Sequence, residues 1–158
     1  MGRRLAGWRA LNWRERGLLA LCALGLTGIH AALALLGYRR TRRAVEALSR
    51  RHAPHAASPG DVAAAQRLAR LAAIAGRHGA VEATCLRQSL LVYGALRSRG
   101  LVPRLHLGLK PADGPLQAHA WVELDGQRLL PGDDEHEVFH PLRRKPRDET
   151  RKDRPIVD

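Results

Sequence analysis

The spacing of apolar residues changes once along this chain, between Gly100 and Pro103, and that change sets the fold class. Before it, the sequence has helical patterns separated by breakers. After it, residues 104–110 and 117–124 read as strands, and the first alternates polar and apolar side chains. Asp125-Gly126 is a strong signal for a two-residue hairpin turn, with residues 127–130 as the returning strand. We therefore predict an α+β fold, with N-terminal helices followed by a small antiparallel sheet.

Helical segments are expected along the first 100 residues, and capping residues mark two of their starts. The expected ranges are 17–37, 39–51 after a kink or break, 62–77 and 85–99. Asp61 is the predicted N-cap of the third segment and Thr84 of the fourth, which Gly100 ends.

Three regions follow from these segments. Residues 1–60 form an apolar helical region and a linker, residues 61–142 form the main domain, and residues 143–158 form a basic tail. The tail has almost nothing apolar to bury, so we expect it to be disordered.

The charge of the chain limits its partners. It carries 27 Lys and Arg against 15 Asp and Glu, a formal net charge of +12. This balance favours an acidic peptide, nucleic acid or an anionic membrane surface. No nucleic-acid-binding module is recognisable, and the arginines are not interleaved with aromatic residues, so we expect no nucleic-acid partner.

One segment, Gly17 to Gly37, contains no Asp, Glu, Lys or Arg. A run of roughly 20 apolar residues is long enough to cross a bilayer. The sequence leaves three settings open for it: a buried or partner-facing helix, a membrane-associated helix, or a true span. Tyr38-Arg39-Arg40 follows where a signal peptide would have small residues, so we do not expect a cleaved signal.

The two cysteines do not form a disulfide framework, because there is no CxxC and only one pair. We expect a reducing, cytoplasmic setting, with membrane association through residues 17–37 left open. Cys22 lies in the apolar run and is expected to be a small buried hydrophobe. Cys85 starts a predicted helix, where unpaired N–H groups and partial positive charge stabilise a thiolate. Position alone leaves two readings of Cys85 open: a nucleophile or a packed helical cysteine.

A histidine on a predicted strand is the candidate partner of this thiol. His119 lies between Ala118 and Ala120, which leave room around its ring; the alternative is a surface histidine on an exposed sheet face. If Leu124 pairs with Gln127 across the turn, His119 lies opposite Gly132. Asp133 and Asp134 are then the carboxylates within reach of the imidazole, and we take Asp133 as the first candidate.

The segment 136–140, His-Glu-Val-Phe-His, matches the HExxH zinc-protease motif. That chemistry needs both histidines on one helix face. Pro141 follows the second histidine directly, and no convincing third ligand lies downstream. We therefore expect no metal or other cofactor, and we expect the segment to form the last edge of the sheet with Val138 and Phe139 packing inward. A second alternative to a cysteine enzyme is a basic accessory protein that binds a membrane or a peptide without catalysis.

From Asp61 to Leu142 the sequence resembles the transglutaminase-like cysteine peptidases of lasso-peptide biosynthesis. The matching motifs are Cys85-Leu86-Arg87-Gln88-Ser89-Leu90, Arg99-Gly100-Leu101-Val102-Pro103, Leu107-Gly108-Leu109, Ala118-His119-Ala120-Trp121-Val122-Glu123 and Asp125-Gly126. The resemblance implies a papain/transglutaminase-like fold and a Cys-His-Asp triad, here Cys85, His119 and Asp133 or Asp134. In many members the triad Asp stands where this chain has Pro131.

The resemblance also implies a reaction and partners. The substrate would be a ribosomal precursor peptide, from which a stand-alone protease removes the leader. Leader recognition would fall to a separate protein, since residues 1–60 lack the strand pattern that a fused recognition domain needs. A cyclase resembling asparagine synthetase would then close the ring.

Overall fold

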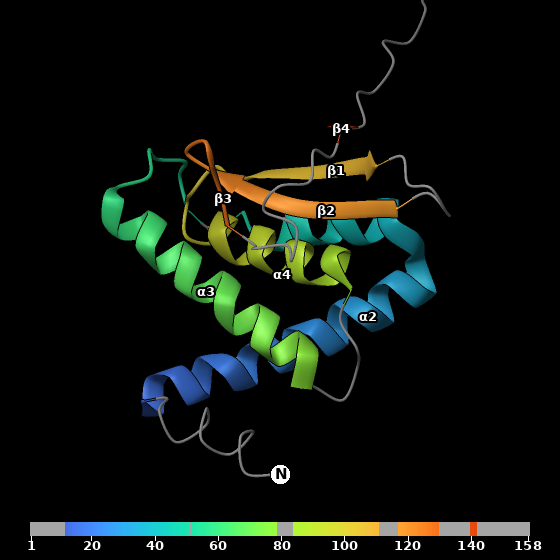
Figure 1. Ribbon diagram of the computed structural model, residues 1–158, viewed down its shortest axis with the longest axis horizontal. Coiled ribbons are helices and arrows are strands. Elements are labelled where there is room, and N and C mark those ends of the chain that lie inside the picture. The colour runs from blue at the N-terminus through green and yellow to red at the C-terminus, as the bar shows by residue number, and fades with distance from the viewer. Residues whose placement is uncertain (1–11, 51, 79–83, 111–116, 130–139, 142–158) are drawn as a thin grey trace, which may run out of the picture.

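Three helices lie on one side of a four-stranded antiparallel sheet in the computed structural model, and the third of them packs against it (Figure 1). The structure describes residues 12–50, 52–78, 84–110, 117–129 and 140–141. The elements are α2 (Trp13–Leu48), α3 (Pro59–His78), α4 (Cys85–Arg97), β1 (Arg104–Lys110), β2 (Gln117–Leu124), β3 (Gln127–Arg128) and β4 (His140–Pro141). The predicted α+β class and order of elements are confirmed. Residues 1–11, the tail 143–158 and its predicted disorder lie outside the described residues, and the boundaries predicted at residues 60 and 142 stay predictions.

Helix α2 consists of two arms that meet at Gly37. Asn12 caps its start, because its side chain accepts the Arg14 N–H at 2.8 Å while Glu15 accepts the Asn12 N–H at 3.0 Å. Gly37 has φ +70° and ψ 171°, a conformation that essentially only glycine adopts. The second arm therefore turns back behind α4 (Figure 1), and the predicted break after residue 37 is confirmed.

Helix α3 begins earlier than the sequence pattern indicates. Ser58 and Asp61 bond reciprocally: the Ser58 N–H donates to the Asp61 carboxylate at 3.0 Å, and the Asp61 N–H donates to the Ser58 hydroxyl at 3.2 Å. This exchange is that of a capping box, with Pro59 opening the helix. The prediction of Asp61 as the N-cap is therefore wrong. Ser58 holds that place, and Asp61 lies in the first turn.

Helix α4 begins at Cys85 as predicted and ends at Arg97, two residues before the predicted end at residue 99. Thr84 is the N-cap residue in extended conformation, although its side chain makes no capping bond, and Cys85 is the first helical residue. Past the last turn, Gly100 takes φ +83°, and the Leu101 N–H reaches back to the Leu96 carbonyl at 3.2 Å. This left-handed closure needs a glycine.

The sheet has the strand order β3-β2-β1-β4. Asp125 and Gly126 both have positive φ, as a tight hairpin turn requires, and Leu124 pairs with Gln127 as predicted. The returning strand is shorter than expected, since β3 ends at Arg128. Strand β4 pairs with β1 at the sheet edge, which confirms the edge position for the end of segment 136–140. Val138 and Phe139 lie outside the described residues.

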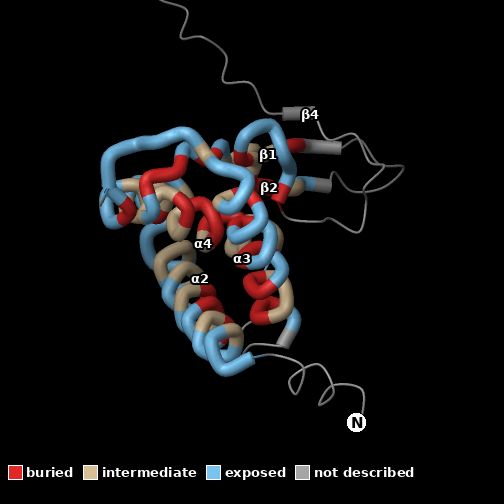
Figure 2. The backbone as a smooth tube through the Cα atoms, turned by 90° about the vertical axis from the view of Figure 1, so that its left-hand side faces the viewer, coloured by how far each residue is buried: buried red, intermediate tan, exposed pale blue. Residues whose placement is uncertain are grey.

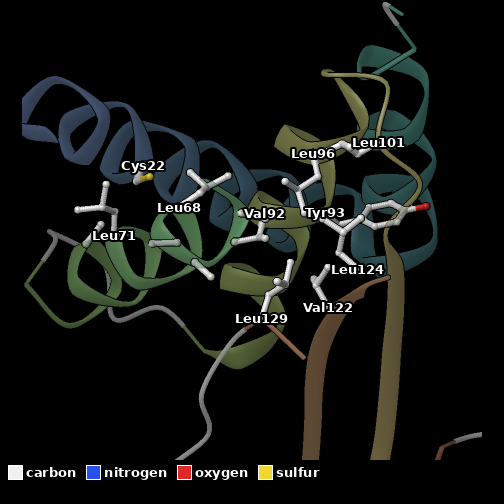
Figure 3. Packing of buried hydrophobic residues seen from close by; sticks show 14 of the residues in the cluster. Cys22, Leu68, Leu71, Val92, Tyr93, Leu96, Leu101, Val122, Leu124 and Leu129 are labelled. Atoms are coloured by element: carbon white, nitrogen blue, oxygen red, sulfur yellow. The ribbon is translucent and has the colours of Figure 1, made fainter. Parts of the chain in front are cut away.

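The core lies where the helices meet one face of the sheet (Figure 3). Its members come from every helix and from the hairpin, including Cys22, Leu68, Leu71, Val92, Leu96, Leu101, Val122, Leu124 and Leu129. Since α2 contributes Leu19, Cys22 and Leu26 to this cluster, it packs as part of the same body as α3 and α4.

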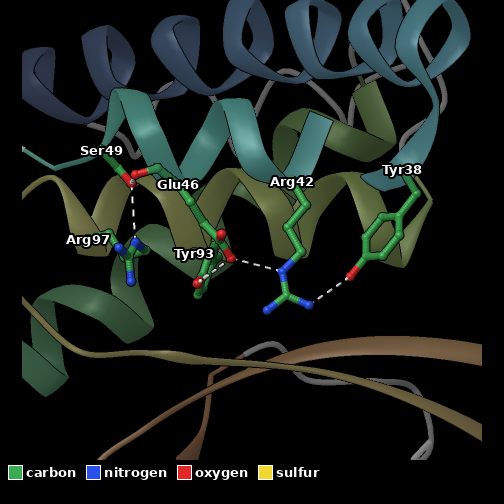
Figure 4. A network of polar contacts seen from close by, with 6 residues as sticks. All are labelled: Tyr38, Arg42, Glu46, Ser49, Tyr93 and Arg97. Atoms are coloured by element: carbon green, nitrogen blue, oxygen red, sulfur yellow. Dashed lines mark hydrogen bonds and ion pairs between the residues drawn. The ribbon is translucent and has the colours of Figure 1, made fainter. Parts of the chain in front are cut away.

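A polar network ties the second arm of α2 to α4 (Figure 4). Glu46 accepts hydrogen bonds from Arg42 at 2.9 Å and from the Tyr93 hydroxyl at 3.2 Å, and Arg97 donates to the Ser49 hydroxyl at 3.3 Å. Partial burial is the largest effect on the pKa of Glu46 and acts to raise it, but the contacts with Arg42, Tyr93 and Arg97 together lower the pKa.

The apolar run of the N-terminal region forms the first arm of α2, which buries only one side. Leu19, Cys22 and Leu26 face the core, whereas Leu21 and Leu24 are exposed. Figure 2 shows buried and exposed stretches of backbone along this arm. Within the described residues, α2 is the one helix long and apolar enough to cross a membrane, and 22% of its most apolar 18-residue window is buried. A helix of this kind fits either a soluble protein or a membrane-associated one.

Candidate active site

Cys85 has the local setting of a cysteine nucleophile. It is half-buried at the first position of α4 and forms no disulfide. The N–H groups of Arg87 and Gln88 donate to the Thr84 carbonyl at 3.0 and 3.2 Å. The helix supplies no acceptor for the N–H groups of Cys85 and Leu86, because the first turn of a helix has no preceding carbonyls. These groups can stabilise a thiolate and later an oxyanion.

Cys22 has the opposite setting. It is 3% exposed within the core between α2 and α3, as the sequence predicts for a small hydrophobe. Burial raises the pKa of the Cys22 thiol, which keeps it protonated and inert at neutral pH. Chemistry at a thiol therefore points to Cys85.

The helix of Cys85 is bonded to the strand of His119. The Ser89 hydroxyl, one turn after Cys85, donates to the carbonyl of Ala120 at 3.0 Å, and Ser89 is fully buried. Ala120 directly follows His119. Figure 1 shows the first turn of α4 and the first residues of β2 at the same end of the domain. The fold thus brings the two elements together, while contact between the thiol and the imidazole stays a prediction.

His119 lies on the sheet face opposite to Val122 and Leu124. Side chains alternate along a strand, so His119 shares its face with Trp121 and Glu123. Across the ladder its neighbour is Gly108, which has no side chain. Because His119 is only two residues from the start of β2, the predicted contact with Cys85 would have to form around the strand end.

A stacked cluster supports the His119 ring. The ring centroids of His119 and Trp121 lie 6.1 Å apart, and those of Trp121 and His106 lie 5.2 Å apart, with interplanar angles of 17° and 13°. The Arg128 guanidinium lies 4.8 Å from the centroid of a Trp121 ring. The aromatic stack limits the orientations open to the imidazole, so Trp121 is a candidate positioning residue.

Glu123 is bound to His106 rather than to His119. The His106 Nε2 and Glu123 Oε2 atoms lie 2.7 Å apart, an ion-pair distance, although the angle is not that of an aligned hydrogen bond. Glu123 lies four strand positions from His119, roughly 13 Å along the strand, which is too far for it to orient that imidazole. The roles of His106, Glu123 and Arg128 were not predicted from the sequence. Alternation along each strand could have shown which side chains share a face. It could not have shown that His106 lies beside Trp121, because that depends on the register between β1 and β2.

The third member of the predicted triad is outside the described residues, since both Asp133 and Asp134 are. Asp125 occupies the hairpin turn with φ +50°, as its predicted turn role requires. Asp133 therefore stays a prediction.

The zinc alternative does not match the backbone. His140 is in β4, paired with Leu109, whereas the HExxH motif needs its second histidine on a helix. Among the described residues, no group of three or more His, Cys, Asp and Glu side chains is placed to hold a metal ion.

A cavity of about 530 Å³ lies at the other end of the hairpin. Pro54 and His55 of the linker, Arg104, and the turn residues Asp125 and Gly126 contribute to its lining. Cys85 and His119 do not line it, so we do not assign the candidate chemistry to this cavity.

Comparison with known proteins agrees with this architecture. The model of the transglutaminase-like superfamily matches residues 23–144, which is most of the chain and includes Cys85, His119 and part of α2. Searches of curated proteins and of solved structures found no match. This superfamily usually carries cysteine protease activity, in a domain of the cysteine peptidase or transferase type. The chain belongs to the transglutaminase-like superfamily.

Proposed function

We propose that this protein is a cysteine peptidase that removes the leader from a ribosomally made lasso-peptide precursor. One observation carries the catalytic part. Cys85 begins α4, and the buried Ser89–Ala120 bond ties that helix to the strand of His119 within a transglutaminase-like domain. The substrate class rests on the resemblance of residues 61–142 to lasso-peptide leader peptidases.

The proposed reaction has two halves. The Cys85 sulfur attacks the carbonyl at the end of the leader while His119 takes the thiol proton, and the N–H groups at the start of α4 stabilise the oxyanion. Collapse breaks the peptide bond, and His119 protonates the departing amine of the core peptide. Water then attacks the thioester, with His119 accepting its proton. This step releases the leader acid, and the proton returns to the Cys85 sulfur. Asp133 or Asp134 would hold the His119 tautomer.

The proposed partners follow from the same resemblance. A separate leader-recognition protein would present the precursor, and a cyclase resembling asparagine synthetase would act on the released core. The net charge of +12 favours an acidic leader or an acidic presenting surface. We place the reaction in the cytoplasm, where a catalytic thiol stays reduced.

Replacing each cysteine separately tests the mechanism. The assay is precursor cleavage, followed by mass spectrometry, with the recognition partner present. We expect Cys85→Ala to abolish cleavage and Cys22→Ala to retain it, provided that circular dichroism shows both variants folded. Cleavage by Cys85→Ala at the wild-type rate would contradict the proposal. An electrophilic probe that labels Cys85 no faster than Cys22 would favour a binding protein without catalysis.

A further inference from the structure

The first arm of α2 presents an apolar stripe to solvent, which we call the outer face. It comprises Leu21, Leu24, Gly28, Ala31 and Leu35, at the alternating three- and four-residue spacing of one helix side. Leu21, Leu24 and Leu35 are 65%, 70% and 81% exposed. Three leucines exposed to this degree along one stripe form a patch of the kind that marks an interaction site.

Arginines flank the segment of the outer face on both sides along the chain. Arg14 lies before the charge-free run 17–37, beside the exposed Trp13, and Arg39, Arg40 and Arg43 are exposed after it. The nearby acid, Glu15, is bound to Arg67 at 2.6 Å, so its charge is compensated. An apolar stripe with arginines at both ends and a tryptophan at one end matches a helix that lies in a lipid headgroup region.

The packing of α2 distinguishes lying on a membrane from spanning one. The side opposite to the outer face holds Leu19, Cys22 and Leu26 in the core. Spanning would remove these side chains from the core, and it would break the ion pair of Glu15 with Arg67 or carry α3 and its arginines into lipid. Lying in the plane of the surface keeps every one of these contacts.

Charge also argues against a second copy as the partner of this face. In a parallel pair of α2 helices the two N-terminal arginine groups would meet, and in an antiparallel pair each would meet the other chain's Arg39 and Arg40. Each chain carries +12, so both arrangements repel. A surface of anionic lipid instead complements the arginines and covers the leucines.

We propose that the protein binds anionic membrane surfaces through the outer face of α2, with that helix parallel to the surface. The sheet lies at the far end of the molecule from this arm in both views (Figures 1 and 2), so β2 stays in water when the helix is bound. This inference does not rest on the proposed peptidase activity.

Co-sedimentation with lipid vesicles tests it on the full-length protein. Neutral phosphatidylcholine vesicles are compared with vesicles that also contain phosphatidylglycerol, at low and high salt. We expect binding to the anionic vesicles, weakened by salt, and at least tenfold weaker binding for the Leu21→Glu/Leu24→Glu variant. Leu48→Glu is the matched control, because Leu48 is 73% exposed on the second arm and off the outer face; its binding should be unchanged.

Three results would overturn the proposal. They are failure of the folded wild type to bind anionic vesicles, equal binding by the double-glutamate variant, and a concentration-dependent dimer that this variant abolishes while vesicle binding is absent. Circular dichroism verifies that each variant is folded. Precursor cleavage measured without vesicles should be the same for Leu21→Glu/Leu24→Glu and wild type, so the two proposals can fail separately.

Discussion

At the scale of single residues, Ser89 connects the candidate nucleophile to the candidate base. It is fully buried, and its hydroxyl bonds to the backbone of the residue after His119. Ser98, near the end of the same helix, also donates to a carbonyl, but that carbonyl belongs to Ala95 in its own helix. Ser89 therefore makes a hydrogen bond between two elements, whereas Ser98 makes one within its own helix.

We predict that Ser89→Ala lowers the free energy of unfolding by about 1–3 kcal/mol, because it leaves the buried Ala120 carbonyl without its donor. It should also slow precursor cleavage. Ser98→Ala should change stability less than Ser89→Ala and leave cleavage unchanged. Urea denaturation measures the first effect. An equal loss of unfolding free energy in the two variants would show that the Ser89–Ala120 bond stabilises the fold no more than the Ser98–Ala95 bond does.

The two histidines of the stacked cluster give a second residue-scale prediction. His119→Ala should reduce the cleavage rate roughly 10²- to 10⁴-fold, the contribution typical of a general acid–base group. His106→Ala removes the other ring stacked on Trp121 and should reduce the rate far less. Steady-state kinetics on both variants measures this difference. A larger loss for His106→Ala than for His119→Ala would reverse the assignment.

At the scale of elements, glycine has opposite roles at two positions of α2. Gly37 forms the break, with a backbone conformation unfavourable to any side chain, whereas a Cβ at Gly28 would meet nothing within 4 Å. We predict that Gly37→Ala destabilises the fold by about 1–3 kcal/mol. Gly28→Ala should stabilise it by about 0.5–1 kcal/mol, since it favours the helix. Thermal unfolding followed by circular dichroism measures both, and the same sign for both would contradict the account of the break.

The elements were largely predictable because their limits are set by local chemistry. Gly37, Gly100 and Asp125-Gly126 fix a break, a stop and a turn by backbone conformation alone. The Ser58 cap was missed because Asp61 has the same capping chemistry three residues later, and only the reciprocal bonds distinguish the two. The stack on Trp121 was not predicted because it depends on the register between β1 and β2, which the sequence of either strand alone does not define.

At the scale of the whole molecule, three carboxylates among the described residues have lowered pKa values. Asn12 and Arg67 lower the pKa of Glu15, and Ser58 lowers that of Asp61. Arg42, Tyr93 and Arg97 together lower the pKa of Glu46 against the effect of burial. A carboxylate with a lowered folded-state pKa adds stability above its unfolded pKa and loses it as the pH falls through the folded value.

We therefore predict that the urea midpoint falls as the pH decreases below about 4.5, the ordinary pKa of a glutamate. Glu46→Gln should lower the midpoint at neutral pH and reduce its dependence on acid, because it removes one of the titrating groups. Wild-type and variant curves that stay parallel from neutral to acid pH would contradict the role given to Glu46.

The positions of Cys85 and His119 relative to each other are determined by the whole fold. The sequence pattern and the family resemblance selected Cys85 and His119, but no local pattern could establish that Ser89 joins their elements. Nor could it show that the face of Val122 and Leu124, and not the face of His119, packs against the helices. Both facts follow from how α4 packs across the sheet, so the proposed mechanism requires the imidazole to act around the start of β2.

The most direct test of the central claim is to find the leader covalently attached to the enzyme. Wild-type protein is mixed with precursor and its recognition partner, quenched in acid, digested and mapped by mass spectrometry. We expect a thioester between the last residue of the leader and Cys85, and no such adduct in Cys85→Ala. Leader attached to another residue, or undiminished cleavage by Cys85→Ala, would contradict it.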